Sequence, residues 1–278
     1  MKRLVLFILS INLGIAQGNL SLNINLEKEI VFYKEHVFLE IIISNSHHTD
    51  VEIQRPYLGT GSLNIVILDS LKNVFEYYGP THCAPPSQTK ISADDNYSEV
   101  YDLNFIYGNE RGDLFRTYRF KPGKYTIQAK YCSNRDTISS SIRNLIVKEP
   151  IDDEEKALHL LTQGFTFFSS NAKLANENAV ASFDSLVEKY PKSNYAPSAL
   201  AQAASICKMV LRDNARANKY YYQLIDKYIN SGHSRDAFAS LKNEIQSRPD
   251  KEEFLKKALE RVNPDFGINY VKEYITKH

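Results

Sequence analysis

The stretch "VKEPIDDEE", Val147–Glu155, decides the expected fold, because the pattern of hydrophobic residues changes across it. Before it, hydrophobic residues recur at every second position, which is typical of strands with one buried face. After it, they recur about every 3.6 residues, which is typical of amphipathic helices. Pro150 and the four acidic residues behind it favour a break followed by a helix N-terminus. We therefore predict an all-β domain over residues 19–149 and an all-α domain over residues 150–278.

The all-β domain is predicted to consist of many short strands separated by turn residues. Hydrophobic and polar residues alternate over residues 20–26, 63–67, 101–107 and 125–131. Further strands are expected at Val37–Ile43 and Ile142–Val147. This pattern favours an antiparallel sandwich.

One corner of the predicted sandwich carries a resemblance to a known family. Pro122 and Gly123 are placed for a type II turn, and Tyr125 follows at the head of a strand. This resembles the tyrosine corner of immunoglobulin-like (Ig-like) sandwiches, in which the Tyr hydroxyl bonds back across the turn. The resemblance covers roughly residues 20–148 and implies an Ig-like antiparallel β-sandwich. Ile127 stands where that family would carry a Cys, and the chain has no Trp.

Two segments of the all-α domain repeat each other 38 positions apart, and a fixed offset in this range indicates a helical array. The matched pairs are Ala179/Ala217, Phe183/Tyr221, Leu186/Leu224, Val187/Ile225, Lys189/Lys227, Tyr190/Tyr228, Ser193/Ser231 and Ala199/Ala237.

The spacing of Ala179, Phe183 and Pro191 resembles the second helix of a tetratricopeptide (TPR) repeat. There a small residue permits close packing, an aromatic residue fills the gap and Pro ends the helix. The resemblance extends to TPR repeats of bacterial envelope proteins, covers about residues 152–262 and implies a TPR-like α-solenoid of about three helix pairs. The second copy has Ile229 where Pro would stand, and the first helices lack the family's Trp. An ordinary helical bundle is the alternative.

The N-terminus, "MKRLVLFILSINLGIAQG", has the features of a secretory signal. Two basic residues precede an apolar run, Leu4–Ala16, that is too short to span a bilayer. Small residues at Gly14 and Ala16 suit a signal peptidase. We predict a signal peptide over residues 1–18, cleaved near Ala16–Gly18, and a secreted or periplasmic protein without a membrane span. An uncleaved anchor is the alternative.

Export would place the three cysteines in an oxidising compartment. Cys83 lies in a polar, Pro-rich loop, Cys132 ends a predicted strand, and Cys207 falls on the apolar stripe of a predicted helix. We predict a disulfide between Cys83 and Cys132, which would contribute about 3–4 kcal/mol in the chain-entropy model. Cys207 is predicted to be a buried free thiol.

The sequence points to no catalytic, cofactor or metal site. It contains no G-x-S-x-G, H-E-x-x-H or glycine-rich phosphate motif, and glycine is scarce at 11 residues. His47, His48 and Asp50 share a polar segment, but adjacent strand residues point to opposite faces, which favours a solvated hairpin loop over a metal site. His82 beside Cys83 supplies neither a zinc ligand set nor the geometry of a nucleophile and its base.

The predicted function is binding of another protein. The formal charge of +1, without a basic stripe, argues against nucleic acid as a partner. A helical solenoid leaves a concave face that can hold a peptide or a partner surface. We predict an exported, non-enzymatic protein-binding or scaffold module of the bacterial envelope. Tyr220 and Tyr222 are the predicted partner-binding residues, because three consecutive tyrosines on a helix span about 200° and cannot all be buried.

Three alternatives stay open. The first is a carbohydrate- or polymer-binding protein that acts through sandwich loops around Tyr57, His82 and Tyr97. The second is an accessory subunit or inhibitor of an exported protease. The third and least favoured is a hydrolase. Four of the 18 tyrosines fall on the apolar face and are predicted to be core residues: Tyr101, Tyr107, Tyr125 and Tyr131.

Overall fold

The computed structural model describes residues 20–58, 61–75, 77, 87–107, 120–132, 137–168, 172–267 and 271–272. The strands are β1 Leu20–Leu26, β2 Ile30–Phe32, β3 Phe38–Asn45, β4 Val51–Gln54, β5 Leu63–Asp69, β6 Gln88–Ile91, β7 Asn96–Asp102, β8 Gly123–Cys132, β9 Thr137–Ser139 and β10 Arg143–Lys148. The helices are α1 Leu103–Tyr107, α2 Asp153–Phe167, α3 Lys173–Lys189, α4 Ala196–Ile206, the π-helix η1 Cys207–Leu211, α5 Asn214–Lys227, α6 His233–Ser240, α7 Lys242–Ser247 and α8 Lys251–Arg261.

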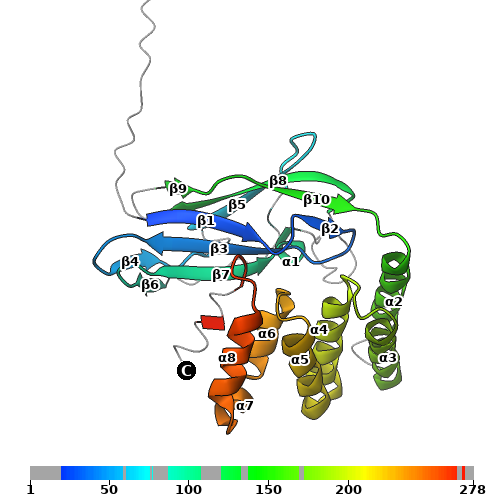
Figure 1. Cartoon of the computed structure of the whole chain (residues 1–278). Helices are drawn as coiled ribbons and strands as arrows, with labels where there is room; N and C mark the ends of the chain where they lie inside the picture. The colour runs from blue at the N-terminus through cyan, green and yellow to red at the C-terminus, as the bar shows by residue number, and fades with distance from the viewer. Residues whose placement is uncertain are drawn as a thin grey trace, which may run out of the picture.

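These elements form three layers, two sheets and a set of helices below them (Figure 1). One sheet has the order β1-β3-β7, and the other has the order β2-β10-β8-β5 with β9 beside β8. β4 and β6 pair separately. Most pairs are antiparallel, but β2 runs parallel to β10 over residues 30–32 and 146–148. The helices α2 to α8 lie below the β1-β3-β7 sheet, on the side away from the second sheet.

The predicted fold class, an all-β sandwich followed by an all-α solenoid, is wrong. The chain is mixed α/β: one sheet contains a parallel pair, a helix lies within the strand region, and the helical layer packs directly on a sheet. The helix α1 occupies residues that were predicted to continue the strand at 101–107. Leu103, Ile106 and Tyr107 are all buried, and their i, i+3, i+4 spacing fits one face of a helix as well as the alternation fits a strand.

The two faces of β3 pack against different parts of the molecule, which joins the sheets to the helices. Leu39, Ile41 and Ile43 belong to the core between the two sheets. Phe38 instead packs with Val100 of β7 and with Phe266, which follows α8. A strand that is buried on both faces cannot form the outer surface of a separate domain.

Gly232, immediately before α6, brings the helices into close contact with this sheet. A Cβ atom at Gly232 would lie 2.2 Å from Cγ of Phe38, so only glycine permits this approach. The backbone N–H of Gly232 donates to Glu27 Oε2 at 2.7 Å. Two further hydrogen bonds join the layers: Tyr195 Oη to the Tyr33 carbonyl at 2.6 Å, and Arg235 Nη1 to the Val100 carbonyl at 2.7 Å.

The 38-residue repeat corresponds to two similar helix–turn–helix units, α3–α4 and α5–α6. After α3, the N–H of Ser193 donates to the carbonyl of Tyr190 at 3.0 Å. After α5, the N–H of Ser231 donates to the carbonyl of Tyr228 at 2.9 Å. The matched residues therefore form the same turn in both units.

The tyrosine-corner hydrogen bond that the resemblance implies is present, since Tyr125 Oη donates to the Lys121 carbonyl at 2.6 Å. The predicted type II turn is wrong, because that turn requires a positive φ at Gly123 and Gly123 does not have one. The predicted core tyrosines are confirmed: Tyr107, Tyr125 and Tyr131 are buried, and Tyr101 packs against the same core.

The predicted signal peptide lies outside the described residues. Within the part of the chain that the structure describes, no helix combines the length and apolar character needed to cross a membrane.

Candidate functional site: an apolar groove between α2, α4 and η1

An apolar groove of about 240 Å³ lies between the C-terminal ends of α2 and α4. Met209 on its wall is 64 % exposed, although it is a large apolar side chain. Of the described residues that line it, only Gln202 and Ser205 are polar. The lining consists of Phe165, Phe168, Gln202, Ser205, Ile206, Met209 and Val210.

One wall of the groove is the π-helix η1, which continues α4. It ends at Leu211, and the φ of 60° at the next residue, Arg212, places a residue other than glycine in the left-handed region. That conformation costs about 1–2 kcal/mol. π-Helical turns and strained backbone both occur often at functional sites. In η1 the side chain of Cys207 is buried, whereas that of Met209 faces the solvent.

The opposite wall is fixed by close packing between α2 and α3. A Cβ atom at Gly164 would lie 2.3 Å from Cε1 of Phe183, so glycine allows these two helices to approach. Phe165 packs edge-on against the buried ring of Phe183, with 5.7 Å between the ring centroids. The groove therefore has one wall held by a buried aromatic contact and one wall of unusual helical geometry.

The predicted partner-binding tyrosines do not line this groove. Tyr220 is 5 % exposed, and its Oη donates to Asp184 at 2.8 Å. Burial, then Asp184, raises the pKa of Tyr220. Tyr222 is half-buried and packs edge-on against Phe254, with the Arg248 guanidinium 5.6 Å from its ring centroid. A role for Tyr220 and Tyr222 in binding a partner stays a prediction.

Buried ionisable groups lie where α6 meets the sheet. His36 Nδ1 is 2.6 Å from Asp102 Oδ2. Burial alone would lower the pKa of His36, but the Asp102 carboxylate raises it above its usual value. The ring of His233 lies 4.7 Å from that of His36, and burial, then the charge on His36, lowers the pKa of His233 to about 3. Asp102 therefore favours the protonated form of His36, whereas burial favours the neutral form of His233.

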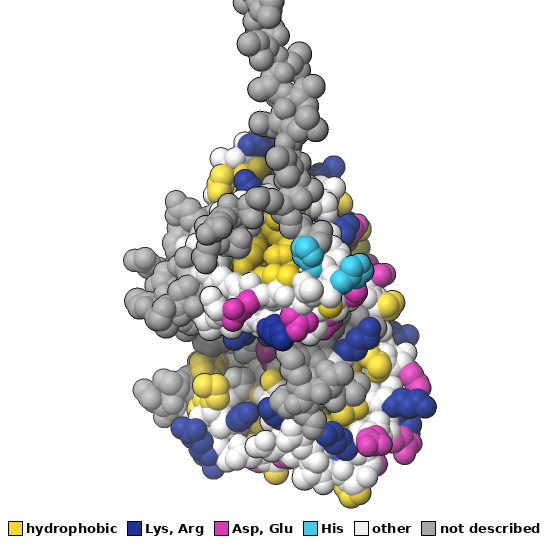
Figure 2. Space-filling view, turned by 90° about the vertical axis from the view of Figure 1, so that its left-hand side faces the viewer, with side chains coloured by type: hydrophobic (Ala, Val, Ile, Leu, Met, Phe, Trp, Pro, Cys, Tyr) yellow, Lys and Arg dark blue, Asp and Glu magenta, His cyan; other side chains and the backbone are white. Residues whose placement is uncertain are grey.

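The segment with His47, His48 and Asp50 is a solvated connection between β3 and β4. The predicted hairpin is wrong, because β3 pairs with β1 and β7 whereas β4 pairs with β6. Both histidines are exposed, and Asp50 binds Lys90 at 2.5 Å. Among the described residues, no three His, Cys, Asp or Glu side chains are grouped so that they could hold a metal ion. Figure 2 shows exposed histidines on this end of the sheets, with basic and acidic side chains interspersed over the same face.

The predicted disulfide cannot be followed through both of its cysteines, because Cys83 lies outside the described residues. Cys132 is half-buried, and its Sγ accepts a hydrogen bond from Thr137 Oγ1 at 3.3 Å. The disulfide stays a prediction. Cys207 is a buried free thiol, and burial raises its pKa to about 11.

The tyrosines proposed for carbohydrate binding are tied to neighbouring side chains. Tyr97 Oη donates to Glu99 at 2.7 Å and accepts from Arg55 Nε at 3.1 Å. The ring of Tyr57 lies 5.4 Å from the Arg55 guanidinium. The third residue of that set, His82, lies outside the described residues.

Comparisons with known proteins assign no family to this chain. No family model matches, and no curated protein matches. A β-glucosidase from Listeria innocua in complex with isofagomine is 12 % identical with a TM-score of 0.29, covering 49 % of this chain and 17 % of the enzyme. A sporulation control protein from Bacillus subtilis is 11 % identical with a TM-score of 0.27, covering 51 % of this chain and 55 % of that protein.

An alkylpurine DNA glycosylase from Pseudomonas fluorescens, bound to DNA containing an abasic site analogue, is 8 % identical with a TM-score of 0.28. The alignment covers 47 % of this chain and 31 % of the glycosylase. This chain thus spans less than two thirds of each of the three proteins. Likenesses of this size assign neither a fold family nor an activity.

Proposed function

We propose that this chain is a non-enzymatic protein-binding module that holds an apolar segment of a partner protein in the groove between α2, α4 and η1. The observation that carries the proposal is the groove itself, lined almost entirely by apolar side chains with the exposed Met209 on its wall. Methionine side chains are flexible and polarisable, and they adapt to differently shaped apolar partners. We include export to the bacterial envelope in the proposal, on the features of the N-terminus.

The size of the groove suits the anchor side chains of a short segment. Burial of one Leu, Phe or Met side chain contributes about 1.5–3 kcal/mol. A micromolar complex needs about 8 kcal/mol, so one anchor is too few and a segment of several residues must contribute. The Gln202 side chain makes no hydrogen bond to another described residue. Its amide can therefore both donate to and accept from the backbone of an extended segment.

The charge beside the groove favours an acidic residue next to the anchors. Arg212 is exposed two positions after Val210, and it forms no ion pair within the described part of the chain. We expect the preferred segment to combine at least two bulky apolar residues with a neighbouring Asp or Glu.

Selection from a peptide library displayed on phage, with the full-length protein as target, tests the proposal. Enriched peptides should carry bulky apolar residues, and their affinity should be measured by fluorescence polarisation. The substitution Met209→Glu should weaken binding at least tenfold, because it places a charge on the apolar wall. Leu174→Glu is the matched control, since Leu174 is 74 % exposed on α3 and does not line the groove.

Enrichment of peptides without apolar anchors would contradict the proposal. So would equal affinity of the Met209→Glu and Leu174→Glu proteins for the selected peptide.

A further inference from the structure

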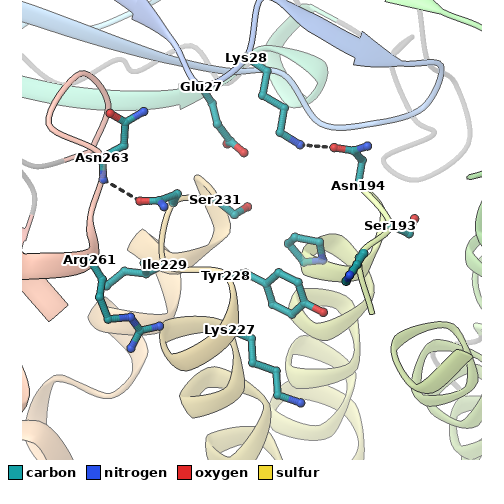
Figure 3. A pocket seen from close by; sticks show the side chains of 13 residues that line it. Glu27, Lys28, Ser193, Asn194, Lys227, Tyr228, Ile229, Ser231, Arg261 and Asn263 are labelled. Atoms are coloured by element: carbon teal, nitrogen blue, oxygen red, sulfur yellow. Dashed lines mark hydrogen bonds between the residues drawn. The ribbon is translucent and has the colours of Figure 1, made fainter. Parts of the chain in front are cut away.

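A larger cleft lies on another part of the molecule, between the β1-β3-β7 sheet and the turns that precede α4 and α6. Its volume is about 560 Å³, within the range of small-molecule sites. Figure 3 shows Glu27 and Lys28 entering from the end of β1, opposite Tyr228 and Ser231 of the α5–α6 turn. The α3–α4 turn and the segment around the end of α8 supply the remaining sides.

The lining of this cleft is predominantly basic. Among the described residues that line it, four are basic and one, Glu27, is acidic. Lys28 binds Glu35 at 2.5 Å and Asn194 at 2.7 Å. The other three basic residues are Lys192, Lys227 and Arg261.

Two of these basic charges are not neutralised within the described part of the chain. Arg261 donates to backbone carbonyls, including that of Asp226, and lies 3.5 Å from the Asp226 carboxylate. Lys192 and Lys227 are exposed and form no ion pair with any described residue. The same cavity is lined by three asparagines and two serines, which can donate hydrogen bonds to a bound oxygen atom.

Glu27 points into the cavity, between Lys28 and Ser231 in Figure 3. Its Oε2 accepts a hydrogen bond from the Gly232 N–H, and its other oxygen accepts no hydrogen bond from the described residues. Burial raises the pKa of Glu27 to about 7, although Lys28 acts to lower it. The protonated form of Glu27 is therefore populated at neutral pH. Two other ionisable groups act on Glu27: Glu35, which raises its pKa, and His36, which lowers it. Arg261, the last residue of α8, lines the same cavity.

We propose that this cleft binds a small polyanion through its carboxylate or phosphate groups. Lys192 and Lys227 supply the uncompensated positive charge, and protonated Glu27 donates a hydrogen bond from its free oxygen to the ligand. Ionised Glu27 would instead repel an anion at this position, so the ligand should bind together with a proton. This proposal does not depend on the apolar groove.

Isothermal titration calorimetry of the full-length protein tests the proposal, with citrate and pyrophosphate as separate probes at constant ionic strength. Constant ionic strength matters because exposed lysines are screened by salt. We expect saturable binding of at least one of the two anions. Binding of citrate alone would assign a carboxylate ligand, and binding of pyrophosphate alone a phosphate ligand. The double variant Lys192→Gln/Lys227→Gln should weaken binding at least tenfold, whereas Lys219→Gln, which alters an exposed lysine outside the cleft, should not.

The pH dependence of the affinity for the anion shows whether Glu27 takes part in binding, in addition to the electrostatic attraction by the lysines. With a pKa of about 7, the protonated fraction of Glu27 falls about tenfold between pH 6 and pH 8, and apparent affinity falls with it. Glu27→Gln cannot ionise and keeps an acceptor for the Gly232 N–H. The same anion should therefore bind Glu27→Gln without that tenfold loss. Comparison of the two proteins removes the contribution of the anion's own titration, which is the same for both.

Any one of the following results would overturn the proposal. These are no binding of either anion, equal weakening by Lys219→Gln and by the double variant, and a pH dependence that is unchanged in Glu27→Gln. Saturable binding of spermidine, with loss of binding in Glu27→Gln, would identify a cation site instead and would also overturn it.

Discussion

Substitution of Gly232 by alanine measures how firmly the helical layer is joined to the sheet. The new Cβ would lie 2.2 Å from Cγ and 2.5 Å from Cδ1 and Cδ2 of Phe38, whose ring is 7 % exposed and cannot swing into solvent. Overpacking of a core by one methyl group costs about 1–3 kcal/mol. Displacement of α6 also lengthens the hydrogen bond from Gly232 to Glu27, and a hydrogen bond contributes about 0.5–1.5 kcal/mol. We expect Gly232→Ala to lower the free energy of unfolding by about 1.5–4.5 kcal/mol.

Urea unfolding at pH 7, followed by far-ultraviolet circular dichroism, gives this free energy. A double-mutant cycle with Phe38→Leu isolates the contact, because the smaller side chain relieves the clash. The two changes together should cost at least about 1 kcal/mol less than the sum of the single changes. Gly164→Ala is the matched control: its Cβ would clash with Phe183 between α2 and α3, away from Phe38, so it should add to Phe38→Leu without coupling.

A free energy of unfolding for Gly232→Ala within about 0.5 kcal/mol of that of the unaltered protein, a change typical of surface sites, would contradict the tight contact with Phe38. Additive effects of Gly232→Ala and Phe38→Leu within about 0.5 kcal/mol, as at distant sites, would contradict it as well.

Three further predictions concern single side chains. The pKa of His233 is about 3 in the folded protein and about 6.5 in the unfolded chain. Its contribution to stability is therefore complete above pH 6.5 and is lost as pH falls, by up to about 1.4 kcal/mol per pH unit. His233→Asn should remove this part of the pH dependence of the unfolding free energy between pH 6.5 and 5, and an unchanged slope would contradict the low pKa of His233. Tyr195→Phe removes the hydroxyl that donates to the Tyr33 carbonyl at 2.6 Å and should lower the free energy of unfolding in urea by about 1–3 kcal/mol. Tyr228→Phe removes an exposed hydrogen bond and should lower it less. Equal losses in the two variants would contradict this prediction. Cys207 should react with a maleimide only at the rate of unfolding, because its thiol is buried and its pKa is raised to about 11. Immediate labelling of Cys207 itself in the folded protein, located by peptide mass mapping, would contradict its burial.

The positions of most strands and helices could be predicted from the sequence, because each depends on a local burial pattern. The change at Pro150 is an example: β10 ends at Lys148, and α2 begins at Asp153. The helix–turn–helix repeat was also visible, since the same buried positions and the same turn serine recur. What the local patterns could not show was which face of the β1-β3-β7 sheet is covered.

A signal for that covered face was present in Val37–Ile43, "VFLEIII", which lacks the alternation of a strand with one wet face. The repeat carried a second signal. Asn194 in the first unit is matched by Gly232 in the second, at the position where Phe38 leaves no room for a side chain. Both signals become clear only when strands and helices are considered together.

The two candidate sites depend on packing that the sequence does not encode locally. The π-helix that carries Met209 has no periodic signature in the sequence. The cleft combines residues as far apart as Glu27, Asn194 and Asn263, so only the folded chain brings them together. No composition pattern marks such a site in advance.

The short segment around Glu27, Lys28 and β2 has consequences for biosynthesis. Its contacts lie far ahead in the chain: β2 pairs with β10, Lys28 bonds to a residue 166 positions later, and Glu27 to one 205 positions later. At about 5–20 residues per second, a ribosome needs about 10–40 s to deliver those partners. During that interval the outer face of β3 is open to other nascent chains. High-level production without chaperones is therefore expected to yield aggregates, and slower translation, which lengthens the interval, should lower the yield of native protein.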